Sequence, residues 1–316
     1  MQATSVPKRG IGFFFVTLIA LAFVRVVLQT FTEFPIWIVP IANIVMGCLF
    51  LGGPLLALCF AARDPWSRKM AAQFLIGGLT LQISCFMLQR FVFQHVGLPA
   101  QVINALGQIG LPIWCVGLGA LLASLIKDRN IVVPIAIFLA WLDMFLVFSP
   151  LGVTNQIIKK FPAMLPAIAV QMPSAHHDTT GERVTPGALA GPADFLFLAM
   201  FLIALFKHDM RARHTVIVVI PTLLAYMLLV TLLKMPLPAL VPIGAVVLLV
   251  NRKEFELTKD EKISTAFVAA LGIALFTWGM FQKRPAPPTD SSPKVHGQEF
   301  SKSPSLPALI DTNQSE

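Results

Sequence analysis

Two aspartates are the residues of this sequence whose type and position could do chemistry. Asp143 lies within the apolar run 131–150 and Asp194 within the apolar run 187–206, whereas the other 14 of the 16 acidic residues lie in loops, in the tail or at segment ends. An acid surrounded by hydrocarbon costs a few kcal/mol or more, so such residues usually face the interior of a helical bundle and serve its function. A protonated acid that only hydrogen-bonds a neighbouring helix is the structural alternative for either residue.

Two acids on consecutive apolar segments can be brought together beside one water molecule. Like charges close together do not both ionise cheaply, so one carboxyl keeps its proton while the other acts as a base. The base takes a proton from water as the water attacks an amide carbonyl, and the acid protonates the carbonyl oxygen. This is the chemistry of an aspartic protease. The same pair could relay protons or cations in a transporter, and the spacing alone leaves both functions open.

The composition indicates what must position these acids. Of the 316 residues, 56% are hydrophobic and only 13% are charged, which is too apolar for a soluble globular domain. Runs of 18 or more apolar residues are long enough to cross a bilayer as helices. The sequence therefore predicts an all-α, polytopic membrane bundle of about nine spans, near residues 11–30, 36–62, 70–94, 100–126, 131–150, 187–206, 214–233, 236–250 and 264–282.

The positive charges predict the orientation of the bundle. The net charge is +8, but the basic residues are scattered in short loops rather than gathered as on a nucleic-acid-binding face, so no nucleic acid partner is expected. Only Lys159, Lys160, Arg183 and Lys234 lie in the opposing loops. Fourteen lie on the other side: Lys8, Arg9, Arg63, Arg68, Lys69, Lys127, Arg129, Lys207, Arg211, Arg213, Arg252, Lys253, Lys259 and Lys262. We expect an integral protein of a prokaryotic inner membrane with a cytoplasmic N-terminus, although Lys283 and Arg284 leave the crossing of the last segment open.

Three short sequence elements follow one another in the second half of the chain. They are Leu142-Asp143, then Gly-Pro-Ala-Asp at residues 191–194, and then Pro-Ala-Leu at residues 238–240, which begins an apolar segment two spans later. In this order they resemble the Tyr-Asp, Gly-x-Gly-Asp and Pro-Ala-Leu motifs of the presenilin and signal peptide peptidase family of intramembrane aspartyl proteases. Leucine stands in place of the tyrosine and alanine in place of the second glycine, whereas the third motif matches fully. The resemblance covers roughly residues 131–250.

The resemblance implies an endopeptidase that cuts transmembrane helices or remnant signal peptides. The orientation predicted from the charges puts the loop between the catalytic helices outside, which resembles signal peptide peptidases rather than presenilins. It implies no metal or other cofactor, and its partners would be such substrates and membrane lipid. An inactive relative that only binds membrane helices is a further alternative. In this interpretation Asp143 and Asp194 are catalytic, and the residues that shape the site are Leu142, Gly191, Ala193, Pro238, Ala239 and Leu240.

Four regions follow from these predictions. Residues 1–130 would form an N-terminal four-helix membrane region, and residues 131–250 a catalytic membrane region with both aspartates and the Pro-Ala-Leu motif. Residues 251–282 would form a loop and an extra hydrophobic segment, and residues 283–316 a disordered polar tail.

Two further groups of residues suggest local structure rather than the main chemistry. His176, His177 and Asp178 could ligate a metal, but without a second cluster they are better interpreted as a solvated loop. A set of glycines in the third and fourth segments predicts close helix packing: Gly77, Gly78, Gly107, Gly110, Gly117 and Gly119.

Overall fold

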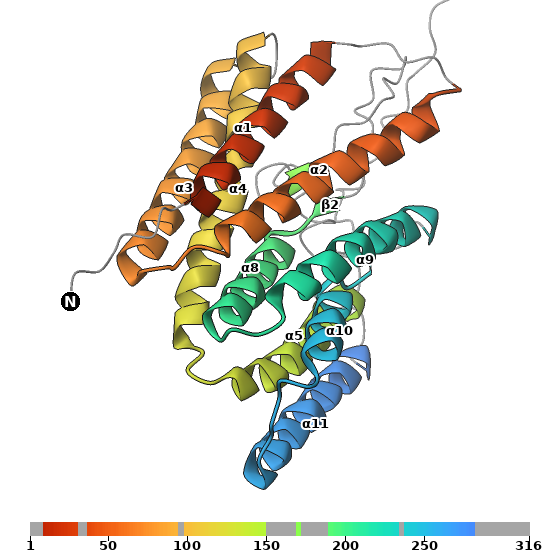
Figure 1. Cartoon of the computed structure of the whole chain (residues 1–316). Coiled ribbons are helices and arrows are strands. Elements are labelled where there is room, and N and C mark those ends of the chain that lie inside the picture. Colours follow the sequence, from red (N-terminus) through yellow and green to blue (C-terminus); the bar gives the residue numbers. More distant parts are fainter. Residues whose placement is uncertain are drawn as a thin grey trace, which may run out of the picture. The chain divides into compact units, whose positions relative to one another are not determined.

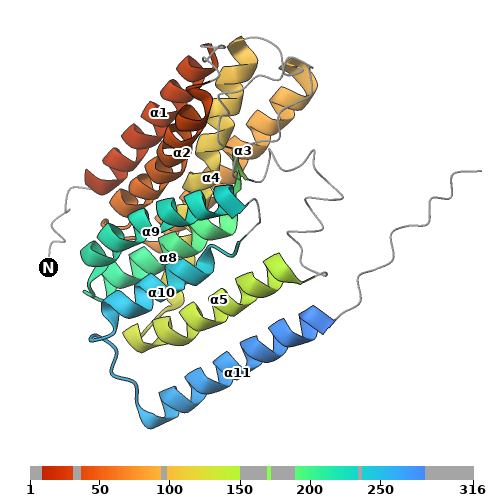
Figure 2. The ribbon, with the colours of Figure 1, turned by 90° about the vertical axis from the view of Figure 1, so that its right-hand side faces the viewer.

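The computed structural model describes residues 9–30, 37–93, 98–149, 169–171, 189–233 and 237–281, all within one compact unit, Met1–Lys283. The predicted loop around His176 and the predicted polar tail lie outside the described residues. The described part is helical apart from two short strands, β1 (Val170–Gln171) and β2 (Leu189–Ala190), which pair antiparallel. The helices are α1 (Arg9–Thr30), α2 (Val39–Ala61), α3 (Arg68–Leu88), α4 (Leu98–Leu125), α5 (Val132–Phe148), α8 (Pro192–Lys207), α9 (Ala212–Leu233), α10 (Leu240–Asn251) and α11 (Lys259–Phe281) (Figures 1 and 2).

Seven of the described helices are long and apolar enough to cross a membrane: α1, α2, α3, α4, α5, α9 and α11. The other two, α8 and α10, have 16 and 12 residues, which is short for a complete crossing. The predicted all-helical class is thus confirmed for the described residues, with several apolar helices compatible with an integral membrane protein. The segments predicted at 187–206 and 236–250 differ from the structure because their helices begin later.

Proline explains the late starts of both short helices. α8 begins at Pro192, where a residue without an N–H is well suited because the first amides of a helix have no partner within it. α10 begins at Leu240, directly after Pro238 and Ala239. Each short helix therefore begins beside one of the sequence motifs singled out above.

The predicted glycine packing is confirmed between α3 and α4, which lie side by side (Figure 2). A Cβ atom added at Gly78 would lie 2.5 Å from the backbone nitrogen of Trp114, and one at Gly110 would lie 2.9 Å from the backbone nitrogen of Gln82. Neither backbone can give way without separating the helices. In contrast, an added Cβ at Gly77 meets nothing within 4 Å.

Gly78→Ala is therefore expected to destabilise the protein by about 1–3 kcal/mol, the usual cost of overpacking a tight contact. Gly77→Ala is the matched control, because its methyl enters open space and alanine favours a helix over glycine. The two variants should be compared by thermal unfolding in the same detergent. Equal melting temperatures would contradict the close α3–α4 contact.

α11 packs along α5, the helix that carries Asp143 (Figure 2). Gly272 and Gly279 allow this approach, because a Cβ at Gly272 would lie 2.7 Å from the Trp141 side chain. The hydroxyl of Ser149, at the end of α5, also donates to the carbonyl oxygen of Gly279 at 3.3 Å.

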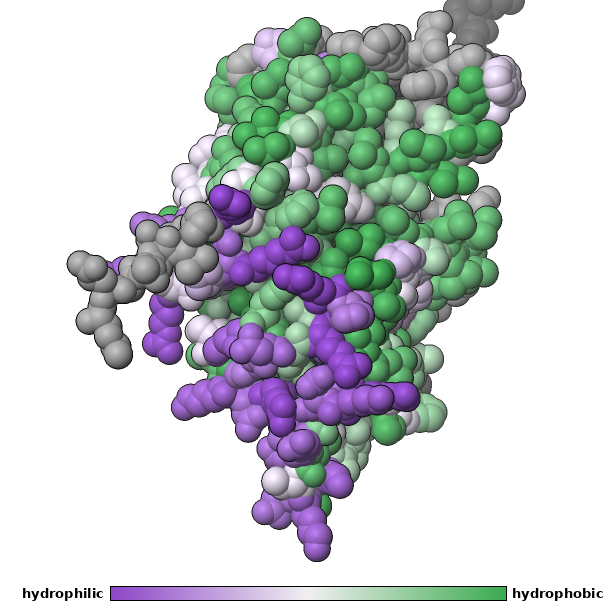
Figure 3. Space-filling view, in the orientation of Figure 1, coloured by the Kyte–Doolittle hydropathy of each residue, from purple (hydrophilic) through white to green (hydrophobic). Residues whose placement is uncertain are grey.

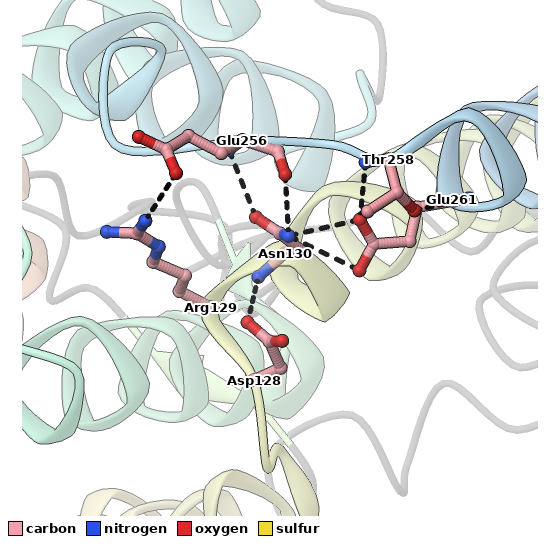
Figure 4. Close-up of polar contacts among 6 residues, drawn as sticks. All are labelled: Asp128, Arg129, Asn130, Glu256, Thr258 and Glu261. Atoms are coloured by element: carbon pink, nitrogen blue, oxygen red, sulfur yellow. Dashed lines mark hydrogen bonds and ion pairs between the residues drawn. The ribbon is translucent and has the colours of Figure 1, made fainter.

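A polar network fixes the other ends of these two helices (Figure 4). The buried Asn130 amide nitrogen donates to the backbone oxygen of Glu256 and to the Glu261 carboxylate, both at 3.1 Å, while its oxygen accepts the backbone N–H of Glu256 at 3.2 Å. Arg129 adds an ion pair with Glu256, with a nitrogen–oxygen distance of 3.4 Å. Because Glu261 also accepts the Thr258 amide at 2.7 Å, the start of α11 is anchored to the start of α5.

The surface separates polar from apolar side chains. Large hydrophobic side chains are exposed along the long helices, including Phe23, Ile76, Leu232 and Phe267 at 65–71%. Hydrophilic residues are concentrated where α2, α4 and α8 end and where α3 and α11 begin (Figure 3). The helix ends that carry most of the basic residues therefore lie on one side of the bundle.

Candidate functional site

Asp143 lies in the second half of α5 and is half-buried. Its carboxylate oxygen Oδ2 accepts a hydrogen bond from the backbone N–H of Leu240 at 2.8 Å, across 97 residues of sequence. Leu240 is the first residue of α10, so the N–H is one of those that a helix leaves without an internal partner. The positive end of the α10 dipole thus faces the acid.

Asp194 lies in the first turn of α8 and is also half-buried. Its Oδ2 accepts the backbone N–H of Gly191 at 3.2 Å, just before the helix. A Cβ added to Gly191 would lie 3.7 Å from this oxygen, an ordinary contact, so the residue contributes its amide rather than its lack of a side chain. Both aspartates are therefore oriented by an amide at a helix start.

The structure brings the two acids close enough for each other's charge to matter. The negative charge of Asp143 acts on Asp194, and both charges act on the hydroxyl of Tyr226. Because the environment is partly buried and largely apolar, such interactions are much less screened than in water. Asp143, Asp194 and Tyr226 thus form one electrostatically connected cluster drawn from α5, α8 and α9.

Tyr226 was not predicted from the sequence. It lies in the apolar helix α9, where an aromatic residue looks like ordinary packing, and the available signal is that it is the sole tyrosine of the chain. Its hydroxyl donates to the carbonyl oxygen of Pro238 at 2.8 Å. Tyr226 therefore holds the segment that leads into α10, whose first amide binds Asp143.

The remaining predicted residues differ in how deeply they are buried. Pro238 and Leu240 are buried, and Leu142 is half-buried against the main core. Ala193 is exposed, while Ala239 is half-buried and its carbonyl oxygen accepts the Ile243 amide at 3.3 Å within the first turn of α10.

Comparisons with known proteins leave the family of this chain open. No family model, curated protein or solved structure matches it.

One further contact supports the position of Asp194. The thiol of Cys115, in α4, donates a hydrogen bond to the carbonyl oxygen of Pro192 at 3.4 Å. The charge of Asp194 also interacts with this thiol. In the part of the chain that the structure describes, no group of three or more His, Cys, Asp or Glu side chains could hold a metal ion. The chemistry available from these described residues is proton transfer between two carboxyls and a bound water or substrate.

Proposed function

We propose that this protein is an intramembrane aspartyl endopeptidase that hydrolyses peptide bonds within transmembrane helices or remnant signal peptides, with Asp143 and Asp194 as its catalytic residues. The observation that carries the proposal is the hydrogen bond from the Leu240 amide to Asp143, beside the charge interaction of Asp143 with Asp194. The hydrogen bond joins the Pro-Ala-Leu element to the element with Asp143, and the charge interaction adds the element that ends at Asp194. These are the elements on which the resemblance to presenilins and signal peptide peptidases rests.

In the proposed mechanism, the two carboxyls share one proton around a water molecule. The ionised carboxyl removes a proton from the water as its oxygen bonds to the amide carbon, and the other carboxyl protonates the carbonyl oxygen. The tetrahedral intermediate then collapses. As the C–N bond breaks, the first carboxyl gives the leaving nitrogen the proton that it took from water, and the second carboxyl regains its proton from a hydroxyl of the intermediate. The amides of Leu240 and Gly191 hold the carboxylate oxygens in place during these transfers.

The depth of the site supports cleavage within the bilayer. Asp143 lies 11 residues after the start of α5, and Leu240 lies 11 residues before the end of α10, so each is about 16 Å from the basic side of its helix. Asp194 is 13 residues from the end of α8, or about 20 Å. In a hydrocarbon core of about 30 Å these positions are close to the midplane.

This depth also favours a particular topology. α8 and α10 each run from the site to the basic side, and together with the seven longer helices they correspond to the nine segments predicted from the sequence. The basic loops then face the cytoplasm, as does the N-terminus. The exposed apolar side chains of the long helices contact lipid.

The proposal is tested with the purified protein in liposomes that contain a synthetic transmembrane peptide with a central helix-breaking pair of residues. We expect two product peptides by mass spectrometry. In H₂¹⁸O, the new carboxyl terminus should gain one ¹⁸O atom, because water attacks the amide carbon directly. Proton-driven solute uptake without cleavage would instead support a transporter, and peptide binding without cleavage an inactive helix-binding protein.

Tyr226→Phe is expected to lower the cleavage rate about tenfold, because the Pro238 carbonyl loses its donor and the start of α10 is held less firmly beside Asp143. The initial rate in the liposome assay measures this. Thr222→Val is the matched control on the same helix, because the hydroxyl of the half-buried Thr222 donates to the Val218 carbonyl oxygen at 2.7 Å, within α9 itself. Equal cleavage rates for both variants would contradict a role of Tyr226 in positioning the site.

A further inference from the structure

A cavity of about 520 Å³ opens between the α2–α3 link, α4 and α8. This volume is within the range of about 300–1,000 Å³ that is usual for small-molecule sites. Three basic residues line it, Arg63, Arg68 and Lys207, whereas Ala123 and Ile203 give it an apolar wall. The cavity is thus cationic on one side and apolar on the other.

The acidic residue that lines this cavity, Asp64, is hydrogen-bonded to the start of α1. The carboxylate of Asp64 accepts the backbone amides of Gly10 at 3.3 Å and Ile11 at 2.8 Å, in the first turn of α1. The positive end of the α1 dipole offsets its charge. The three basic residues also outnumber this one acid, so the lining keeps an excess of positive charge and the cavity favours an anion.

The basic residues are held at the cavity rather than scattered over the surface. The Lys207 ammonium donates to the carbonyl oxygens of Ala123 at 3.2 Å and Ile126 at 2.7 Å, so its charge is fixed where α4 ends. The Arg63 guanidinium carbon lies over the Phe60 ring, 5.3 Å from the ring centre. Both arginines are exposed enough to reach an incoming ligand.

We propose that this cavity binds the phosphate headgroup of an anionic phospholipid. Arg63 and Arg68 would contact the phosphate oxygens, and the apolar wall would accept the first part of an acyl chain. Basic cavities between transmembrane helices on the cytoplasmic side are suited to anionic headgroups. The ring of Trp66, whose N–H donates to the Ala61 oxygen at 2.9 Å, also lines the cavity and is typical of the membrane–water boundary.

This site is separate from the proposed catalytic pair. Lys207 and Asp194 are at opposite ends of α8, about 20 Å apart. Lipid binding can therefore be measured whether or not the protein cleaves peptides.

The test is native mass spectrometry of the purified full chain in a neutral detergent, titrated with phosphatidylglycerol and, separately, phosphatidylcholine. The double variant Arg63→Gln, Arg68→Gln is expected to bind phosphatidylglycerol about 30-fold more weakly than the wild type. The matched control is Arg252→Gln, Lys253→Gln, which removes two exposed charges from another basic loop that does not line the cavity. It should bind like the wild type.

Three outcomes would overturn the assignment. If both double variants lose affinity equally, the effect is a general attraction to the basic face. If the wild type binds phosphatidylcholine as tightly as phosphatidylglycerol, the cavity does not recognise an anion. If inorganic phosphate binds with an affinity that depends on Arg63 and Arg68 while phosphatidylglycerol does not, the ligand is a soluble phosphate compound rather than a lipid.

Discussion

Asp143→Asn and Asp194→Asn are each expected to abolish peptide cleavage, with a loss of at least about a thousandfold in rate. Asparagine has the size of aspartate but neither takes nor gives a proton at this step. Its side-chain oxygen can still accept the amide that now orients each acid, from Leu240 or Gly191. The helix starts should therefore keep their positions, and the loss would report on chemistry rather than on folding.

The matched control for these variants is Asp209→Asn. Asp209 is exposed in the turn between α8 and α9 and has a φ of 50°, a backbone conformation that asparagine adopts readily. Its cleavage rate should equal that of the wild type. Cleavage that survived either substitution in the pair would exclude the proposed mechanism, and elution and melting profiles like those of the wild type would show that the variants fold.

The positions of the helices could be predicted from the sequence because apolar length is a local property. Each of the nine predicted segments overlaps one of the described helices. The late starts of α8 and α10 were not predicted, since the segments were delimited by hydrophobicity while Pro192 and Pro238 determine where regular hydrogen bonding can begin.

The candidate site could be predicted only in part. The two aspartates stand out because charge is costly in an apolar segment, and the resemblance singled out residues 238–240. The role of Tyr226 depends on the packing of α9 against α10, which no local pattern encodes, and its bond to the Pro238 oxygen follows only from that packing. The cavity near Arg63 likewise depends on packing, because its lining comes from the α2–α3 link, α4 and α8, which lie in separate parts of the sequence.

Leu240→Pro is expected to lower the turnover number about a hundredfold, because it deletes the N–H that binds Asp143. Proline is well tolerated at the first position of a helix, so α10 can still form, with some strain at Ala239, whose helical φ of −77° and ψ of −22° a following proline disfavours. Without this donor the Asp143 carboxylate can rotate away from the geometry needed for proton transfer. The loss should therefore fall on kcat, with a smaller change in KM, because the substrate helix is held mainly by other contacts.

Leu240→Ala is the matched control, because it removes the buried side chain but keeps the N–H. We expect it to lower stability by about 2–5 kcal/mol while kcat falls much less than in the proline variant. The reverse order, with full turnover in the proline variant and a large loss in the alanine variant, would mean that the leucine side chain shapes the site and its amide does not. The pair of variants thus separates the packing role of the Pro-Ala-Leu motif from its hydrogen bond to the first aspartate.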